Sequence, residues 1–275
     1  MSYATVMVSL TVDQSNDAVL EVAGQLVEKF DARVIGIAAA VLGPPPYFMA
    51  GDFAQDFVDQ GEASIRKRMA EIEVQFRAAM NGRTRDVEWR CSLELPARYI
   101  VREARAADIV VAASAGEALV DPFAVAGPND LVMQVGRPLL VVPPSVRWLD
   151  LRSALVAWKD GAEARRAIAG ALPLLRKAGE VVVAAIAQDE NDRSEMLRQA
   201  DDVVSWLARH GIQASSMVPE GIGNAQIRLD RIAGDITAGF VVAGAYGHSR
   251  FREWVLGGVT QHLVQQDARC SLLSR

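Results

Sequence analysis

The chain repeats itself, and this repeat constrains its fold more than any other feature. A segment near the carboxyl end matches an earlier one at an offset of 131 positions, which places Val110 on Val241 and Gly116 on Gly247. Such self-similarity indicates two copies of one arrangement of strands and helices. The fold of this chain must therefore be one that both halves can adopt.

A second match supports the repeat and locates an insertion. The segment that begins at Ala4 resembles the one that begins at Leu151, with Asp13 and Asp160 separated by 147 positions. Because the two offsets differ by 16, the first copy should carry about 16 additional residues. Residues 42–57, LGPPPYFMAGDFAQDF, hold three prolines and two glycines, so we predict an irregular loop there.

Each copy alternates short apolar runs with segments of helical periodicity. Runs such as VVVAAI (181–186) are apolar on both faces, as expected for strands that helices cover on both sides. The alternation predicts parallel strands with right-handed crossovers, and hence an α/β fold of two tandem, open, five-stranded parallel sheets flanked by helices. The expected strands are 5–10, 33–41, 86–93, 108–113, 138–143, 153–158, 180–186, 213–218, 239–243 and 270–274. The expected helices lie around 19–30 and 65–76 and over 97–106, 162–177, 193–209, 225–235 and 257–266.

Length and composition agree with two globular domains. The chain has 275 residues, of which 51% are hydrophobic, enough to bury two cores. The Pro143–Pro144 pair stands between the two copies. We assign residues 1–146 to a first unit and residues 147–275 to a second unit.

Charge and cysteine content exclude several classes of partner. The net charge of −5 does not favour nucleic acid. No apolar run approaches the roughly 20 residues of a membrane helix, and the start of the chain is expected to form a strand and not a signal peptide. Cys91 and Cys270 form neither a disulfide framework nor a set of metal ligands. No metal site is expected, and the expected location is cytoplasmic.

Ligands of open α/β sheets bind beyond the carboxyl ends of strands, where the strand order reverses. In the second unit two such ends stand out, residues 157–161 and residues 244–247. Gly244 and Gly247 allow a tight turn and a close approach to main-chain amides. The Gly257–Gly258 pair opens the next predicted helix, whose free N–H groups suit phosphate.

The second of these segments carries a recognisable spacing. In GAYGHSRFREWVLGGVT, Gly244, Gly247 and Gly257 match the signature Gly-x-x-Gly-x9-Gly-Ser/Thr, which resembles that of the universal stress protein family. WKDGAEARRA, from Trp158, is similar to the first strand-to-helix turn of that family. The resemblance covers nearly the whole chain. It implies the adenine nucleotide alpha hydrolase-like fold and, because many members bind ATP, a nucleotide site.

The resemblance also implies where a nucleotide would lie. The triphosphate would lie on main-chain amides around the glycines, and the adenine would lie near the ends of the first and second strands of the second unit. The implied binding residues are Ala157, Trp158, Lys159, Asp160, Ala185, Gly244, Gly247, His248, Gly257, Gly258, Val259 and Thr260. The implied ligand is ATP, with or without magnesium, or a related adenine nucleotide.

The chain departs from the family pattern in both units. In the second unit Gly258 stands where Ser or Thr is usual, and Lys159 stands about where an Asp often contacts the nucleotide. In the first unit Ala113 and Ala126 replace signature glycines, and Pro128 follows Gly127. We therefore expect the first unit to be a degenerate, structural copy. Pairing of the two units as a pseudo-dimer would bring residues 138–143 near 270–274; a homodimer is the other arrangement.

These observations predict a regulatory stress protein that binds an adenine nucleotide in its second unit with little turnover, at most a slow ATPase. One alternative is a member that binds no nucleotide and acts as an interaction module, which Gly258 and Lys159 favour. A second is an α/β hydrolase, because Ser114 follows a strand as in a nucleophile elbow. That enzyme would need a histidine nearby, yet His210, His248 and His262 all lie in the second unit.

Overall fold

The computed structural model describes residues 2–43, 52–114, 121–187, 189, 191–220, 224–247 and 258–275. Strands alternate with helices along these residues. The strands are β1 (Thr5–Leu10), β2 (Arg33–Ala39), β3 (Val87–Ser92), β4 (Ile109–Ala113), β5 (Leu139–Val142), β6 (Ser153–Trp158), β7 (Glu180–Ala185), β8 (Ser215–Met217), β9 (Phe240–Gly244) and β10 (Cys270–Ser274). The helices are α1 (Asp17–Phe30), α2 (Asp52–Met80), α3 (Pro96–Glu103), the short 3-10 helix η1 (Ala104–Ala106), α4 (Pro128–Gln134), α5 (Ala162–Leu175), α6 (Arg193–Arg209), α7 (Ala225–Asp235) and α8 (Gly258–Gln265).

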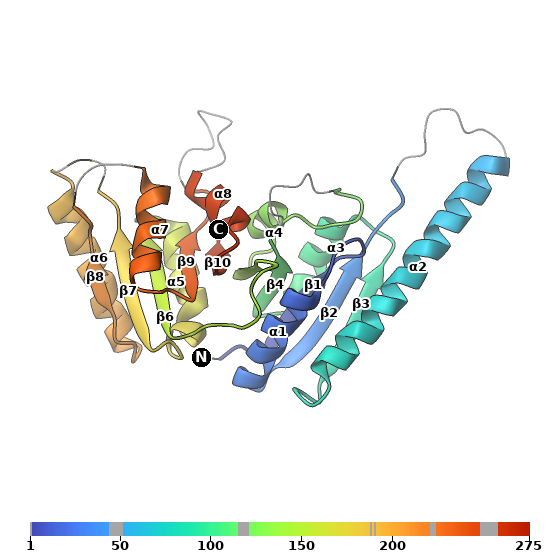
Figure 1. Ribbon diagram of the computed structural model, residues 1–275, viewed down its shortest axis with the longest axis horizontal. Coiled ribbons are helices and arrows are strands. Elements are labelled where there is room, and N and C mark those ends of the chain that lie inside the picture. Colours follow the sequence, from blue (N-terminus) through green and yellow to red (C-terminus); the bar gives the residue numbers. More distant parts are fainter. Residues whose placement is uncertain are drawn as a thin grey trace.

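These strands form one ten-stranded sheet in the order β3-β2-β1-β4-β5-β10-β9-β6-β7-β8. Read inward from either end, both halves have the same order, which is what the internal repeat predicts. The strands within each half pair in parallel, as predicted. In Figure 1 the two halves lie side by side, with the carboxyl end between them. The division at residues 146 and 147 stays a prediction.

Helices cover both faces of the sheet because successive strand residues point to opposite sides. Val6 and Val8 of β1 belong to one buried cluster, which includes residues of α1, α2, α5 and α6. Met7, between them, belongs to a second cluster with residues of α3, α4, α7 and α8. The strands that helices cover on both faces are therefore largely apolar, as the runs in the sequence indicate, whereas the end strands β3 and β8 also carry polar residues.

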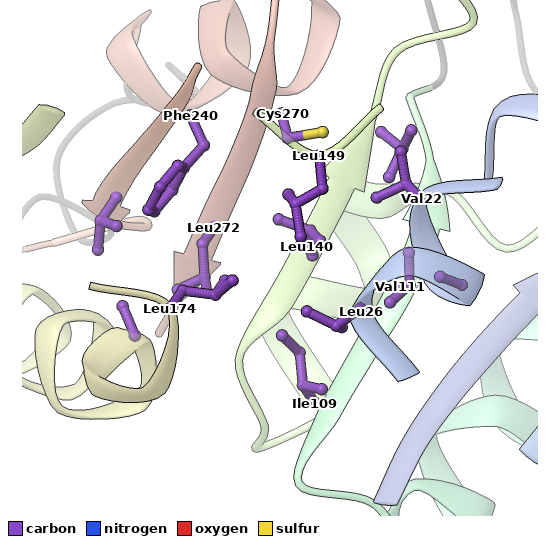
Figure 2. Packing of buried hydrophobic residues seen from close by; sticks show 14 of the residues in the cluster. Val22, Leu26, Ile109, Val111, Leu140, Leu149, Leu174, Phe240, Cys270 and Leu272 are labelled. Carbon is purple, nitrogen blue, oxygen red and sulfur yellow. The ribbon is translucent and has the colours of Figure 1, made fainter. Parts of the chain in front are cut away.

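One antiparallel pair joins the two halves. Strand β10 pairs with β5 so that Leu272 lies opposite Leu140, and both are fully buried. Figure 2 shows these leucines among the apolar side chains of both halves, with Val22 and Leu26 of α1 on one side and Phe240 of β9 on the other. The predicted proximity of residues 138–143 to residues 270–274 is confirmed. The two expected sheets are thus one continuous sheet.

One expectation about the first half is wrong, and one helix there was not predicted. Residues 52–57 belong to α2, so the predicted loop over 42–57 does not extend that far; residues 44–51 lie outside the described part. The glycines and prolines of that segment end at residue 51, and nothing after it prevents a helix. Helix α4 was not expected, although Pro128 occupies its first turn, where proline is favourable. Helix α5 continues past Pro173 and ends two residues later.

No helix in the described ranges is long and apolar enough to span a bilayer.

Candidate functional site

The second half reverses its strand order between β6 and β9. From β6 the chain proceeds outward to β7 and β8, and then returns to β9 on the other side of β6. The turns that follow these two strands, residues 159–161 and 245–247, are called the switch-point turns here. Because parallel strands end at the same edge of a sheet, both turns lie where ligands of open α/β sheets bind.

Gly244 allows a helix to pack closely on the end of β9. A Cβ at this residue would lie 2.6 Å from the main-chain nitrogen of Ala164 and 2.8 Å from Cγ of Glu163. Both atoms belong to residues in the first turn of α5. The missing side chain at Gly244 therefore makes room for α5.

Glu163 lies between the two switch-point turns. A Cβ at Gly161 or at Gly247 would lie 2.8 Å from the carboxyl carbon of Glu163, closer than side-chain carbons normally come. The half-buried Glu163 side chain thus extends from the first turn of α5 to Gly247. Glu163 was not among the residues expected at this site. In the sequence it is marked only as an acidic residue in the first turn of a predicted helix, which is common because it suits the helix dipole.

The residues expected near an adenine differ in exposure. Ala157 is half-buried and Lys159 is exposed, whereas Trp158 and Ala185 are buried. Asp160 is paired with Arg165, whose Nη2 lies 2.6 and 2.9 Å from its two carboxylate oxygens. A buried Ala185 can contact a ligand through its main chain alone.

The start of α8 lies against the turn that follows β9. The Tyr246 main-chain N–H donates to Oγ1 of the buried Thr260 at 3.4 Å. Gly258 opens α8 and is exposed, and Val259 is half-buried. A Cβ at Gly258 would lie 2.5 Å from the side-chain amide nitrogen of Gln226. His248 and Gly257 lie outside the described residues.

Tyr246 links this turn to the other half of the molecule. It adopts a left-handed backbone conformation, with φ of 59°. Its hydroxyl donates to Oδ1 of Asn129 in α4 at 2.7 Å, and the Asn129 side-chain amide donates to Gln261 of α8 at 3.3 Å. No local sequence pattern predicts this contact, because Asn129 and Tyr246 are 117 positions apart.

The turn that follows β1, which corresponds to residues 159–161 of the second half, is bridged by the side chain of Asn16. Asn16 is buried, accepts a hydrogen bond from the Thr11 N–H and donates one to the Thr11 carbonyl, both at 2.9 Å. Ala126 is buried, and Ala113 is half-buried at the end of β4. The first half therefore differs from the second in two ways. The Asn16 side chain bridges its turn after β1, and alanines stand where the second half has glycines.

The position of Ser114 does not favour the hydrolase alternative. This serine is buried, and its hydroxyl donates to the main-chain carbonyl of Val264 at 2.6 Å. A nucleophilic serine needs a base that removes its proton, whereas this hydroxyl donates to a carbonyl oxygen of α8.

Cys270 lies opposite Phe240 at the start of β9, and therefore at the other end of the strands from the switch-point turns. Burial raises the pKa of the Cys270 thiol to about 12, which keeps it protonated near neutral pH. Within the part of the chain that the structure describes, no three His, Cys, Asp or Glu side chains gather as a metal site would require.

An adenine nucleotide fits part of this arrangement. Gly247 and the exposed start of α8 offer main-chain atoms without side-chain bulk, as phosphate binding requires. The Glu163 carboxylate, however, already lies beside Gly247 and has the same sign of charge as phosphate. The main chain of these turns thus suits phosphate, whereas the Glu163 side chain lies in the same place and opposes it by charge.

No family model and no curated sequence matches the chain. A universal stress protein from Archaeoglobus fulgidus DSM 4304 is similar in structure, with a TM-score of 0.74 at 15% identity over 98% of this chain and 96% of that chain. A functionally unknown protein from Pseudomonas aeruginosa PAO1 is similar with a TM-score of 0.58 at 13% identity over 99% of this chain and 92% of that one.

At these identities the likeness concerns the fold. It extends over both halves of the chain, and it agrees with the strand order and with the helices on both faces. The chain therefore has the universal stress protein fold.

Proposed function

We propose that this protein belongs to the universal stress proteins, acts as a regulator in the stress response, and binds ATP or a related adenine nucleotide in its second unit with little turnover. The observation that carries the proposal is the contact between the turn after β9 and the first turn of α8. The hydrogen bond from Tyr246 to Thr260 brings Gly247 close to the helix start at Gly258. The turn that carries Gly247 thus lies against the first described turn of α8, at the point where the strand order reverses.

In this proposal main-chain groups provide most of the binding. The phosphates lie on amides around Gly247 and the start of α8, where the helix dipole favours negative charge. The adenine lies near the end of β6, beside Ala157 and Lys159, and near the main chain of Ala185. Such contacts hold a nucleotide without activating water, so any hydrolysis is expected to be slow. Magnesium would be carried by the phosphates, and a cytoplasmic location stays a prediction.

Equilibrium dialysis of the purified protein with ATP tests the proposal. We expect measurable binding at or below about millimolar nucleotide, equivalent to about −4 kcal/mol. Absorbance at 260 nm of the protein as purified would detect a nucleotide that copurifies. Absence of binding to any adenine ligand would overturn the proposal and favour a role as an interaction module.

A substitution at Gly247 locates the site. Gly247→Val should weaken nucleotide binding by about tenfold or more, because the added side chain would occupy the turn that phosphate must approach. Gly234→Val in α7 is the control, since a Cβ there has no atom within 4 Å. Equal binding by the wild type and the Gly247 variant would place the nucleotide elsewhere.

A further inference from the structure

Glu163 supplies an anion to the switch-point turns from within the chain. Three glycines from two segments make room for its side chain. A Cβ at Gly244 would lie 2.8 Å from Cγ of Glu163, and Cβ atoms at Gly161 or Gly247 would lie 2.8 Å from its carboxyl carbon. The side chain therefore crosses from α5 to the end of β9, and its carboxylate lies beside Gly247.

The surroundings explain why a carboxylate is stable in this position. The first turn of α5 has N–H groups without partners inside the helix, and the positive end of the helix dipole lies there. The nearest acidic neighbour along the chain, Asp160, is paired with Arg165. A phosphate at Gly247 would therefore lie next to a carboxylate that the first turn of α5 already favours.

The competition acts on the charged part of a ligand and not on its base. Two negative charges about 4 Å apart repel each other strongly near a protein surface, where screening is incomplete. An adenine and ribose near Ala157 and Lys159 carry no such charge. The effect of Glu163 should therefore grow with the number of phosphates on the ligand.

We propose that Glu163 is a selectivity residue, which makes the second unit favour adenosine or its monophosphate over the triphosphate. This inference rests on the proposed function, because it concerns the same site. It assigns to one side chain the discrimination among adenine ligands that the glycine signature alone does not provide.

The experiment measures the dissociation constants of adenosine, AMP and ATP by equilibrium dialysis, without divalent cations, for the wild type and for Glu163→Gln. Glutamine keeps the size of the side chain and removes its charge. We expect ATP to bind on the order of tenfold more tightly to the variant, and adenosine to change by less than about twofold. AMP should lie between these limits.

Asp17→Asn is the matched control. Asp17 is the acidic residue in the first turn of α1, so its substitution removes the same charge from the corresponding helix of the first unit. It should leave all three dissociation constants unchanged. Thermal unfolding of both variants separates a change in affinity from a loss of folded protein.

The possible outcomes distinguish this inference from the proposed function. If ATP binds equally to the wild type and to Glu163→Gln, the selectivity role is wrong and nucleotide binding stands. If adenosine and ATP tighten equally, Glu163 acts on the shape of the site, and the charge argument is overturned. If no adenine ligand binds to either protein, the proposed function fails, and the inference fails with it.

Discussion

Glu103 is an acidic side chain around which three arginines gather in the first half. Its carboxylate lies 2.7 Å from Arg90, 3.1 Å from Arg105 and 3.4 Å from Arg102, and its side chain is 11% exposed. Burial raises the pKa of Glu103, but the hydrogen bonds from Arg105 and Arg102 outweigh it, so the pKa lies below its ordinary value. Such a carboxylate stabilises the fold above the pKa of the unfolded chain, about 4.3, and the stabilisation is lost as the pH falls.

A substitution at Glu103 should therefore have a pH-dependent effect. Glu103→Gln is expected to lower the free energy of unfolding by about 1–3 kcal/mol near neutral pH, because hydrogen bonds to a charged group are lost. The difference from the wild type should shrink below about pH 4. Urea unfolding at several pH values measures it. Glu62→Gln, in an exposed pair with Arg66, is the control, and a difference that persists in acid would contradict the assignment.

At the scale of elements, the close contact between α5 and β9 depends on Gly244. The atoms that a Cβ there would meet at 2.6 and 2.9 Å belong to the main chain of Ala164. Main-chain atoms of a helix cannot rotate away as a side chain can. The helix would have to move away from the sheet, and with it Glu163.

Gly244→Ala should therefore lower the free energy of unfolding by about 1–3 kcal/mol. Gly234→Ala in α7 should raise it by about 0.5–1 kcal/mol, because its Cβ has open space and alanine favours a helix. Chemical denaturation monitored by circular dichroism measures both. Addition of one methyl group would thus lower the free energy of unfolding at Gly244 and raise it at Gly234. Equal effects of the two substitutions would refute the packing explanation.

The elements also show where local patterns are sufficient. Periodicity and apolar runs predicted β6, α6, α7 and β10 to the residue, since their boundaries depend on nearby turns and caps. Asn224, for example, caps α7 by accepting from the Gln226 N–H at 2.8 Å. Helix α4 was missed because it is short and packs against α3, β5, α8 and β10, of which α8 and β10 belong to the other half of the chain.

At the scale of the whole molecule, the pairing of β5 with β10 makes one sheet from two copies. Leu139, Leu140, Leu272 and Leu273 of this pair are fully buried. This strand pair therefore joins the halves through apolar side chains, in addition to polar contacts such as that of Tyr246 with Asn129, and each half covers a strand edge of the other.

Truncation of a leucine in this pair should weaken both halves. Leu272→Ala is expected to cost about 2–5 kcal/mol, whereas Leu197→Ala, at a position 41% exposed on α6, should cost less than about 1 kcal/mol. Urea unfolding measures the cost. Amide hydrogen exchange should become faster in β4 as well as in β9; faster exchange in the second half alone would show that the halves unfold independently.

The hydrogen bond between Tyr246 and Asn129 offers a second test of coupling between the halves. Tyr246→Phe and Asn129→Ala should each lower the free energy of unfolding by about 0.5–1.5 kcal/mol. The double variant should lose less than the sum, because both substitutions remove the same bond. Strict additivity in this cycle would mean that the bond contributes nothing.

The sequence by itself determined the repeat, the α/β class, most strand and helix boundaries, and the glycines at the carboxyl end of β9. The repeat follows from comparison of segments 131 and 147 positions apart. The class, the boundaries and the glycine turn follow from patterns within about 15 residues, where hydrophobic periodicity and turn residues act. Only the tertiary structure decided that Glu163 lies beside Gly247, that Tyr246 contacts Asn129, and that β5 pairs with β10. Each of these contacts joins residues more than 80 positions apart, and chain folding alone brings them together.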